Sequence, residues 1–192
     1  KGQMYDWFLD QNASYFGYRH AAAPLHCQFN PADSLIYRIN ASPKEKKNMR
    51  VEALLADPSG TLLWSATEET EADANAVVKK WKVDFSKTVS PVNFLRLKIT
   101  YTSTGEMIDD NTYWIPSDPS DYSKLFDLPS TEVSLAILKK TGNKYSVEVS
   151  NNGSAVAFFI RLKIFRTSDN VVVSPVMPAD NYFTMLLGEN RH

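Results

Sequence analysis

The sequence has few of the residues on which common catalytic and metal-binding motifs depend. Of its 192 residues, one is cysteine, three are histidine and seven are glycine. The single cysteine, Cys27, excludes an internal disulfide and a structural zinc site. No glycine-rich phosphate loop, dinucleotide fingerprint or G-x-S-x-G nucleophile elbow occurs. No motif therefore indicates a particular reaction, and no cofactor is expected.

A net charge and long apolar runs are also missing. Lys and Arg total 21 and Asp and Glu total 22, which leaves a formal net charge of −1. This balance provides no long-range field for nucleic acid or anionic lipid, so no nucleic-acid partner is expected. No run approaches the ~18 consecutive apolar residues of a membrane helix, so no membrane span is expected.

The sequence does contain enough apolar material for a folded core. Hydrophobic residues make up 43% of the chain and aromatic residues 12%, while 22% is charged. Disordered chains are poor in apolar residues and carry a high net charge. This composition differs on both counts, so general disorder is not expected. Because domains run to ~100–200 residues, the length fits one large domain or two small ones.

The first 24 residues differ from the rest and predict a short helix. Asn12 or Ser14 caps it, because their side chains accept hydrogen bonds from free amides of the first turn, and Pro24 ends it. A helix of ~10 residues is not stable alone in water. The large apolar side chains of this segment therefore need a partner surface; they are Trp7, Phe8, Leu9, Tyr15 and Phe16. Nothing reads as a signal peptide, and the abrupt start at Lys1 and end at His192 suggest a fragment.

From residue 25 onward, short segments rich in β-branched and aromatic residues predict strands. In the first half these are residues 25–30, 35–40, 49–56, 61–67, 77–85, 94–102 and 107–115. In the second half they are residues 133–139, 144–150, 158–166, 171–174 and 182–187. In segment 77–85, alternation places one set of side chains on a single apolar face, namely Val77, Lys79, Trp81, Val83 and Phe85. The acidic stretch 68–75 indicates a solvated loop or edge rather than a site.

A weak internal repeat divides the strands into two groups. Residues 34–65 and 144–174 both read as strand, Asn-x-Ser, long strand, four-residue turn and apolar strand, offset by about 110 residues. Short strands with turn signals at this spacing favour β-sandwiches. We therefore predict an immunoglobulin-like sandwich at 25–118, a linker at 119–128 and a second sandwich at 129–192. The second has too few strands, so we expect it to be incomplete, with an open edge and further strands after residue 192.

No residue in this pattern is a convincing catalytic group. The acidic residues present no pair of the kind that a glycosidase needs in a cleft. His20, His26 and His192 lack the spacing of metal ligands. Cys27 is expected to be a small buried residue, and His26 beside it points to the opposite face of the strand. The residues therefore predict no catalytic, cofactor-binding or metal site.

Aromatic side chains are the remaining candidates, because they can stack on sugars. Trp64, Trp81 and Trp114 lie on predicted strands, where core packing is the better interpretation. Tyr5 and Trp7 lie outside both sandwiches, so they are candidate carbohydrate contacts. Three Asn-x-Ser sequons, at Asn12, Asn40 and Asn152, matter only in a eukaryotic secretory protein.

Three stretches carry a family resemblance. The segment GQMYDWFLDQNASYFG at residues 2–17, followed by PLHCQFN at 24–30, resembles the end of the catalytic barrel in glycoside hydrolase family 2 enzymes of the exo-β-glucosaminidase, β-mannosidase and endo-β-mannosidase type. The segment NTYW at 111–114, with DY at 121–122 and LP at 128–129, resembles the join between their two C-terminal immunoglobulin-like domains. Residues 179–189 resemble a segment late in the last domain, although Leu187 stands where the family usually has proline.

The resemblance implies a mainly β fold with two tandem immunoglobulin-like β-sandwiches, preceded at residues 1–24 by a helical remnant of a (β/α)8 barrel. It implies an upstream catalytic barrel of the same polypeptide as partner, and a glycan as substrate of the parent enzyme. That enzyme would hydrolyse β-mannosides or β-glucosaminides with retention, using carboxylates ~5–5.5 Å apart. The family's catalytic glutamates lie upstream of this stretch, so no catalytic residue is assigned and the fragment alone is expected to be inactive. The family also implies a periplasmic, secreted or lysosomal location.

A different class of function remains open from the residues alone. A free-standing carbohydrate-binding or adhesion module would need an exposed aromatic platform, for which Trp7 or Trp64 would be the candidates.

Overall fold

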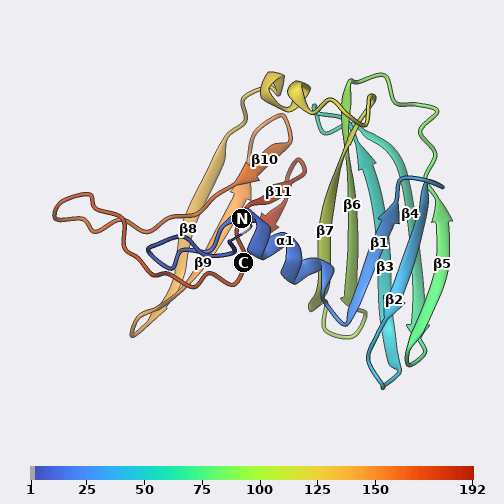
Figure 1. Cartoon of the computed structure of the whole chain (residues 1–192), viewed down its shortest axis with the longest axis horizontal. Coiled ribbons are helices and arrows are strands. Elements are labelled where there is room, and N and C mark those ends of the chain that lie inside the picture. Colours follow the sequence, from blue (N-terminus) through green and yellow to red (C-terminus); the bar gives the residue numbers. More distant parts are fainter. Residues whose placement is uncertain (1–2) are drawn as a thin grey trace.

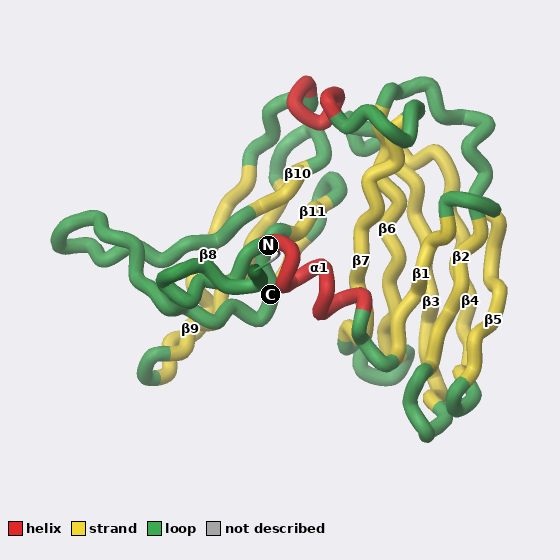
Figure 2. Tube along the Cα trace, in the orientation of Figure 1, coloured by secondary structure: helices red, strands yellow, loops and turns green. Residues whose placement is uncertain are grey.

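The computed structural model describes residues 3–192 and shows a mainly β molecule with several antiparallel sheets and a short α-helix. Two groups of strands stand side by side, with helix α1 (Ala13–Ala21) between them (Figure 1). Loops connect most elements, and they are longest in the C-terminal group (Figure 2). Within the described residues, no helix is sufficiently long and apolar to cross a membrane.

Helix α1 begins where the sequence predicts. The side chain of Asn12 accepts a hydrogen bond from the amide of Tyr15 at 3.1 Å, which satisfies one of the free donors of the first turn. Asn12 is therefore the cap, and Ser14 lies inside the first turn. The helix ends before Pro24, and it buries Phe16.

The first group contains the seven strands expected, and they form two antiparallel sheets. One sheet has the order β1-β2-β5 and consists of β1 (Leu25–Asn30), β2 (Leu35–Asn40) and β5 (Ala76–Lys82). The other has the order β4-β3-β6-β7 and consists of β3 (Lys46–Ala56), β4 (Leu62–Ala72), β6 (Val92–Tyr101) and β7 (Met107–Pro116). Buried side chains of both sheets form one core, among them Phe29 and Ile36 from the first sheet and Leu55 and Leu97 from the second. The acidic residues 68–72 belong to edge strand β4, in keeping with the solvated edge predicted there.

The alternation predicted for segment 77–85 is wrong. Leu35 pairs with Lys82 but Tyr37 pairs with Lys79, so β5 carries one residue more than β2 over this stretch. Such a β-bulge exchanges the two faces of the strand. Val77 and Lys79 are consequently exposed, whereas Trp81, Val83 and Phe85 pack against the core. Lys80, expected on the polar face, is nearly buried and contacts Glu68 at 2.9 Å.

The second group contains five strands but is less regular. After the 3₁₀ helix η1 (Ser123–Asp127) come β8 (Val133–Thr141), β9 (Lys144–Asn151), β10 (Ala157–Ile160), β11 (Phe183–Met185) and β12 (Asn190–Arg191). They form a sheet of order β12-β9-β8 and a separate pair, β10-β11. Strand β12 was not predicted. Its two residues pair with Val149 and Ser150 of β9.

The strands predicted at 158–166 and 171–174 do not form as such. Phe159 has φ +53°, in the left-handed region, so the extended backbone is interrupted within β10. The Asn181 side chain then takes the place of a neighbouring strand, since it accepts from the amide of Leu162 at 2.7 Å and donates to its carbonyl at 3.0 Å. Beyond this point an isolated bridge joins Phe165 to Val172.

The internal repeat is visible in the structure at one buried asparagine per group. Asn40 ends β2 and Asn151 ends β9. Each accepts a hydrogen bond from the amide two residues on and donates to the carbonyl four residues on, at Lys44 and Ala155. Each also donates to carbonyls of a distant segment. The structural counterpart of Asn40 is therefore Asn151, one residue before the sequon that the sequence pattern aligns with it.

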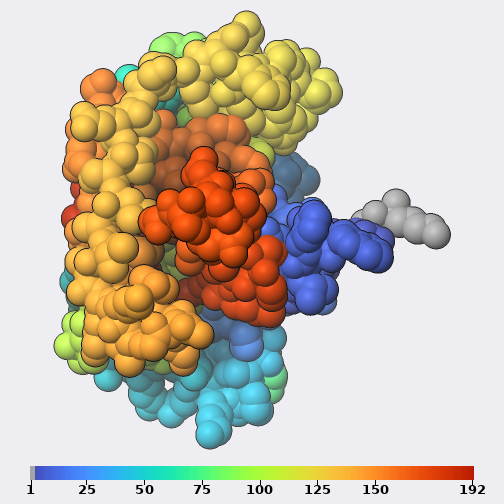
Figure 3. All heavy atoms as spheres, turned by 90° about the vertical axis from the view of Figure 1, so that its left-hand side faces the viewer, coloured from blue at the N-terminus to red at the C-terminus, as the bar shows by residue number. Residues whose placement is uncertain are grey.

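Much of the second group is open to solvent. Every residue of β8 is exposed, and a core forms where β9 meets the β10-β11 pair, from Val149, Ala157, Phe183 and Met185. Viewed from the β8 side, β8, β9 and the loops that follow β10 lie at the left and in front, with the yellow segment around η1 above them (Figure 3). Apolar residues of β8 such as Ile137 therefore lie on an uncovered face and edge.

Candidate functional site

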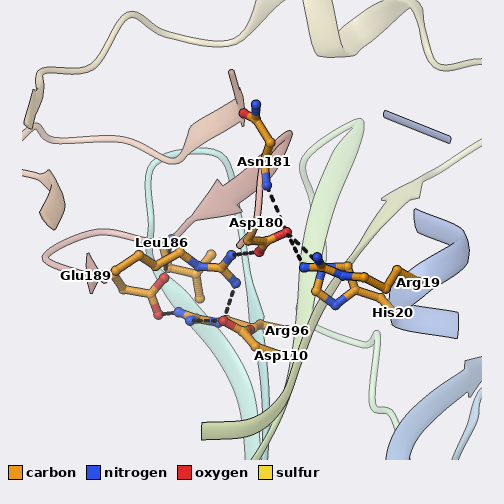
Figure 4. Close-up of polar contacts among 9 residues, drawn as sticks. Arg19, His20, Arg96, Asp110, Asp180, Asn181, Leu186 and Glu189 are labelled. Atoms are coloured by element: carbon orange, nitrogen blue, oxygen red, sulfur yellow. Dashed lines mark hydrogen bonds and ion pairs between the residues drawn. The ribbon is translucent and has the colours of Figure 1, made fainter. Parts of the chain in front are cut away.

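The most concentrated chemistry in the structure is a set of buried and half-buried ion pairs (Figure 4). They lie where helix α1, the β6-β7 hairpin and residues 179–191, the C-terminal segment, meet. We call this set the charge cluster. Strand β6 provides Arg96, β7 provides Asp110 and α1 provides Arg19 and His20, while the C-terminal segment provides Asp180, Glu189 and Arg191.

Arg96 and Asp110 form the centre of the charge cluster. Leu95 and Leu97 belong to the first core, so alternation turns Arg96 to the other face of the sheet, toward the second group. Nε and Nη2 of Arg96 donate to the two oxygens of Asp110, both at 2.8 Å. This two-point geometry is the strongest form of a guanidinium–carboxylate pair. Arg96 also pairs with Glu189, and its side chain is 3% exposed.

Arg191 extends the cluster toward the helix. It forms an ion pair with Asp110, and its Nη1 donates to Oδ2 of Asp180 at 2.8 Å. Its guanidinium also lies 4.7 Å from the ring centre of Phe183, close enough for a cation–π contact. Asp110 is thus shared by two arginines from different parts of the chain.

Asp180 connects the cluster to α1. Nε2 of His20 lies 3.1 Å from Oδ1 of Asp180, and Arg19 lies 3.9 Å from the same oxygen. Arg19 also donates to the carbonyl of Ala179. The hydrogen bond with Asp180 raises the pKa of His20 against the opposing effect of burial.

Asp110 and Asp180 are held in the ionised form. Burial pushes the pKa of Asp110 upward, but the hydrogen bonds from Arg96 and the charges of Arg191 and Arg96 outweigh it, so this pKa is lowered. For Asp180, burial is likewise outweighed by the hydrogen bond and charge of His20 and by Arg191, and its pKa is lowered too. A carboxylate that stays ionised and paired makes a poor general acid, so the cluster is suited to holding elements together.

An apolar contact adjoins the charge cluster and completes the junction between the two groups. Ala56 and Phe94 of the first group are buried against Val156 and Leu186 of the second. The ring of Trp114 meets that of Phe158 edge-on, with 4.9 Å between the ring centres. The backbone also crosses this boundary, since the amide of Val156 donates to the carbonyl of Pro58 at 3.0 Å.

Asp109, next to Asp110 on β7, has a different environment. Alternation turns it toward β1, where it accepts a hydrogen bond from the amide of Cys27 at 2.9 Å. Burial raises the pKa of Asp109 to about 6, and burial also raises the pKa of Cys27 to about 12. The prediction that Cys27 is a small buried residue is confirmed. Nδ1 of His26 lies 2.6 Å from the carbonyl oxygen of Ala23.

The two candidate carbohydrate contacts lie together before helix α1. Tyr5 and Trp7 line an open depression of about 430 Å³ with Gln3, Asp6 and Leu9. Trp7 is 92% exposed, while the ring of Tyr5 packs against that of Tyr15, with 5.4 Å between the ring centres. Nothing in the structure tests whether a sugar binds there, and this role stays a prediction.

The apolar side chains that were expected to need a partner divide into two sets. Phe16 is covered within the chain, with its ring 6.1 Å from that of Tyr182. Trp7, Phe8 and Leu9 remain exposed. Tyr15 is half-buried, with its ring beside those of Tyr5 and Phe16, so the exposed members of this set all lie before the helix.

The strand tryptophans pack as predicted. Trp64 and Trp81 lie against the first core, and Trp114 lies in the apolar part of the junction. Among the sequons, Asn40 is buried and Asn12 caps the helix, whereas Asn152 is exposed. Among residues 3–192, no group of three or more His, Cys, Asp or Glu side chains is placed to hold a metal ion.

The charge cluster was missed at the sequence level, although β6 carries a signal for it. Its residues Val92 to Leu97 are all buried, and a strand that is apolar on both faces indicates burial on both sides. Arg96 within such a strand requires a buried partner of opposite charge. One partner, Asp110, lies on the next strand of the predicted hairpin and could have been considered. The other, Glu189, lies about 90 residues later in the chain, where no local pattern reveals it.

Comparison with known proteins gives consistent matches. The family model described as "Exo-beta-D-glucosaminidase Ig-fold domain" matches residues 111–192, so an immunoglobulin-fold domain is part of the chain. A mannosylglycoprotein endo-β-mannosidase from Lilium longiflorum is 24% identical over 100% of this chain and 27% of its own length. An exo-β-D-glucosaminidase from Arthroderma benhamiae is 26% identical over 95% of this chain and 23% of its own.

A solved structure has the same fold. The exo-chitosanase CsxA of Amycolatopsis orientalis superposes with a TM-score of 0.84 at 22% identity, over 98% of this chain and 25% of that one. The chain thus spans about a quarter of the length of the relatives it matches. The resemblance drawn from residues 2–30, 111–129 and 179–189 is confirmed.

Proposed function

From the homology of this chain to the C-terminal region of glycoside hydrolase family 2 enzymes of the exo-β-glucosaminidase and mannosidase types, we propose that it is the non-catalytic accessory part of such a glycosidase. The observation that carries the proposal is coverage: 95–100% of the chain aligns with the endo-β-mannosidase of Lilium longiflorum and the exo-β-D-glucosaminidase of Arthroderma benhamiae, yet it fills about a quarter of each of these two relatives. The parent enzyme would hydrolyse β-glucosaminides or β-mannosides.

In this proposal, residues 25–118 and 129–192 are tandem immunoglobulin-like sandwiches joined by a linker at 119–128. The two sheets around one core in the first group support this assignment. The match to an immunoglobulin-fold family supports it for the second. Residues 1–24 would be the helical end of a (β/α)8 barrel.

The charge distribution supports a non-catalytic role. Retaining hydrolysis needs one carboxyl group that donates a proton and another that attacks, both facing a cleft. The acids of the charge cluster are instead paired with arginines, and Asp109 is enclosed in the first core region against the amide of Cys27. The catalytic pair would be contributed by the upstream barrel.

The exposed segment before α1 supports a contact with that barrel. Trp7, Phe8 and Leu9 place adjacent large apolar side chains in solvent, a cost that a covering surface would remove. The two groups, held together at the junction, would then support the barrel from one side.

An activity assay on the purified chain tests the proposal. We expect no turnover of aryl β-D-glucosaminides or aryl β-mannosides above the buffer rate. Circular dichroism and a cooperative thermal transition serve as the control that the chain is folded. Hydrolysis that co-purifies with the folded chain would contradict a non-catalytic role.

A free-standing carbohydrate-binding module is the second candidate, and the exposure of Trp7 beside Tyr5 favours it. Titration calorimetry with mannan and with chitosan oligosaccharides distinguishes the two. Heat that disappears in Trp7→Ala but persists in Tyr18→Ala, an exposed aromatic control outside the depression, would support the module. If no heat is measured, the carbohydrate-binding module is contradicted and the accessory role is retained.

A further inference from the structure

Helix α1 is fastened to the C-terminal segment at a small number of polar contacts. The Arg19 guanidinium donates to the carbonyl of Ala179, and His20 meets Asp180 with 3.1 Å between Nε2 and Oδ1. Asp180 is itself fixed, because its Oδ2 accepts from Arg191 at 2.8 Å. Among the helix side chains in this contact, that of His20 changes charge near neutral pH.

We propose that His20 is a proton-controlled link between helix α1 and the C-terminal segment, closed when the imidazole is protonated and weakened when it is neutral. The proposal concerns the chain itself and holds whether or not the accessory role is correct. It rests on the position of His20 at the end of the charge cluster, in contact with a carboxylate that the cluster holds in place (Figure 4).

The geometry makes Nε2 of His20 a hydrogen-bond donor to Asp180. Oδ1 of Asp180 accepts from the amide of Asn181 at 2.9 Å, and the same oxygen faces His20. With both oxygens of Asp180 already accepting, an imidazole nitrogen beside it must be a donor. The protonated imidazole adds the attraction between its positive charge and the carboxylate to this hydrogen bond. The loss of the proton removes that attraction and keeps the N–H donor, so it weakens the contact without abolishing it.

The charged groups around His20 come from three elements. Arg19 on the same helix opposes protonation, whereas Asp180 on the C-terminal segment and Asp109 on β7 favour it. Arg191 and Asp110 lie beyond Asp180 and largely neutralise each other. The balance raises the pKa of His20 above 6.5, with the Asp180 hydrogen bond as the main cause.

The direction of the pH response follows from this shift. A basic group whose pKa is higher in the folded state stabilises it fully below the unfolded pKa, here 6.5, and loses that contribution as the pH rises through the raised value. The arginine pairs at Arg96 and Arg191 do not titrate in this range. Asp109 also titrates near this range, because burial raises its pKa to about 6, but it lies on β7 and contacts the amide of Cys27. We therefore assign to His20 the part of the response that appears at α1 and its contact with residues 179–181 and that is lost in His20→Gln.

Proton NMR of the three histidine side chains tests the link. The chain is titrated from about pH 5 to about pH 9, and His20→Gln and His26→Gln assign the signals. We expect His20 to titrate above 6.5 in the wild-type chain and its midpoint to fall in Asp180→Asn. A wild-type midpoint at or below 6.5, or a midpoint that Asp180→Asn leaves unchanged, would overturn the proposal.

Amide hydrogen exchange shows whether the proton controls the helix. After correction for the intrinsic rate, protection of residues 13–21 should decrease as the pH passes the His20 midpoint, while β6 should not respond. His26→Gln should retain this behaviour and His20→Gln should lose it. If Asp180→Asn does not fold, the wild-type chain decides alone: a His20 midpoint at or below 6.5, or protection of residues 13–21 that does not change across that midpoint, refutes the link.

Discussion

At the scale of single residues, the junction depends on charges that cannot be removed one at a time. Arg96 is 3% exposed and pairs with Asp110 and Glu189, which are themselves largely buried. Buried pairs of this kind add little net stability, because desolvation offsets their attraction. Deletion of one partner is nevertheless destabilising, because it leaves the other charge buried without a partner.

We predict that Arg96→Met lowers the free energy of unfolding by about 3–5 kcal/mol, because Asp110 and Glu189 keep their charges in a buried place. Urea denaturation monitored by tryptophan fluorescence measures this. Arg50→Met is the matched control, since its pair with Glu69 is exposed and should matter by less than about 1 kcal/mol. Equal effects of the two substitutions would show that the charge cluster is not a structural element.

The buried asparagines lead to a second prediction. Asn151→Ala removes the donor to three carbonyls, at Ala155, Met185 and Leu186, and should cost about 1–3 kcal/mol. Asn152 is one residue later but exposed, so Asn152→Ala should change the free energy of unfolding by no more than about 0.5 kcal/mol. Thermal denaturation of the pair measures the difference. Similar melting temperatures would contradict the role assigned to Asn151.

The reactivity of Cys27 provides a third test. Because burial raises the pKa of its thiol to about 12, almost no thiolate is present near pH 8. The folded chain should therefore react with a thiol reagent at the rate at which it unfolds, and in urea the reaction should be rapid. Fast labelling of the folded chain at pH 8 would show that Cys27 is accessible.

At the scale of elements, local chemistry determines the first group more completely than the second. The bounds of β1 and β2 agree with the prediction, because a single alternating face and flanking turn residues define them. The bulge in β5 escaped prediction, since it depends on register with β2. In the second group, the left-handed backbone at Phe159 and the capping of Leu162 by Asn181 are long-range effects. Apart from the pair of Arg96 and Asp110 within one hairpin, the charge cluster likewise joins residues that are distant in sequence, so those pairs could not be derived from spacing.

The turn between β3 and β4 leads to a prediction about the junction. Gly60 has φ +82°, and a Cβ there would lie 2.9 Å from Cβ of Leu187 in the second group. Gly60→Ala should therefore cost about 1–3 kcal/mol through backbone strain and overpacking. Gly105 also has a positive φ, but a Cβ there would lie in open space. Gly105→Ala should therefore introduce backbone strain without overpacking and lower the free energy of unfolding by less. Equal losses in chemical denaturation would indicate that the two groups do not press together at this turn.

At the scale of the whole molecule, one junction joins a well-formed first group, a more open second group and a short helix. Apolar side chains form one half of that junction and the charge cluster forms the other. The chain is homologous to about a quarter of much longer glycosidases. In our proposal its contribution is support for the catalytic part, and the exposed segment at Trp7 is where the two would meet.

The central claim is that hydrolysis requires polypeptide beyond this chain, and a side-by-side assay tests it most directly. The purified chain and a longer polypeptide that carries an upstream (β/α)8 barrel before it are compared at equal molarity on aryl β-D-glucosaminide and aryl β-mannoside. The account predicts turnover of one of these substrates by the longer polypeptide and none by the folded chain alone. Equal turnover per mole by the chain alone would contradict it.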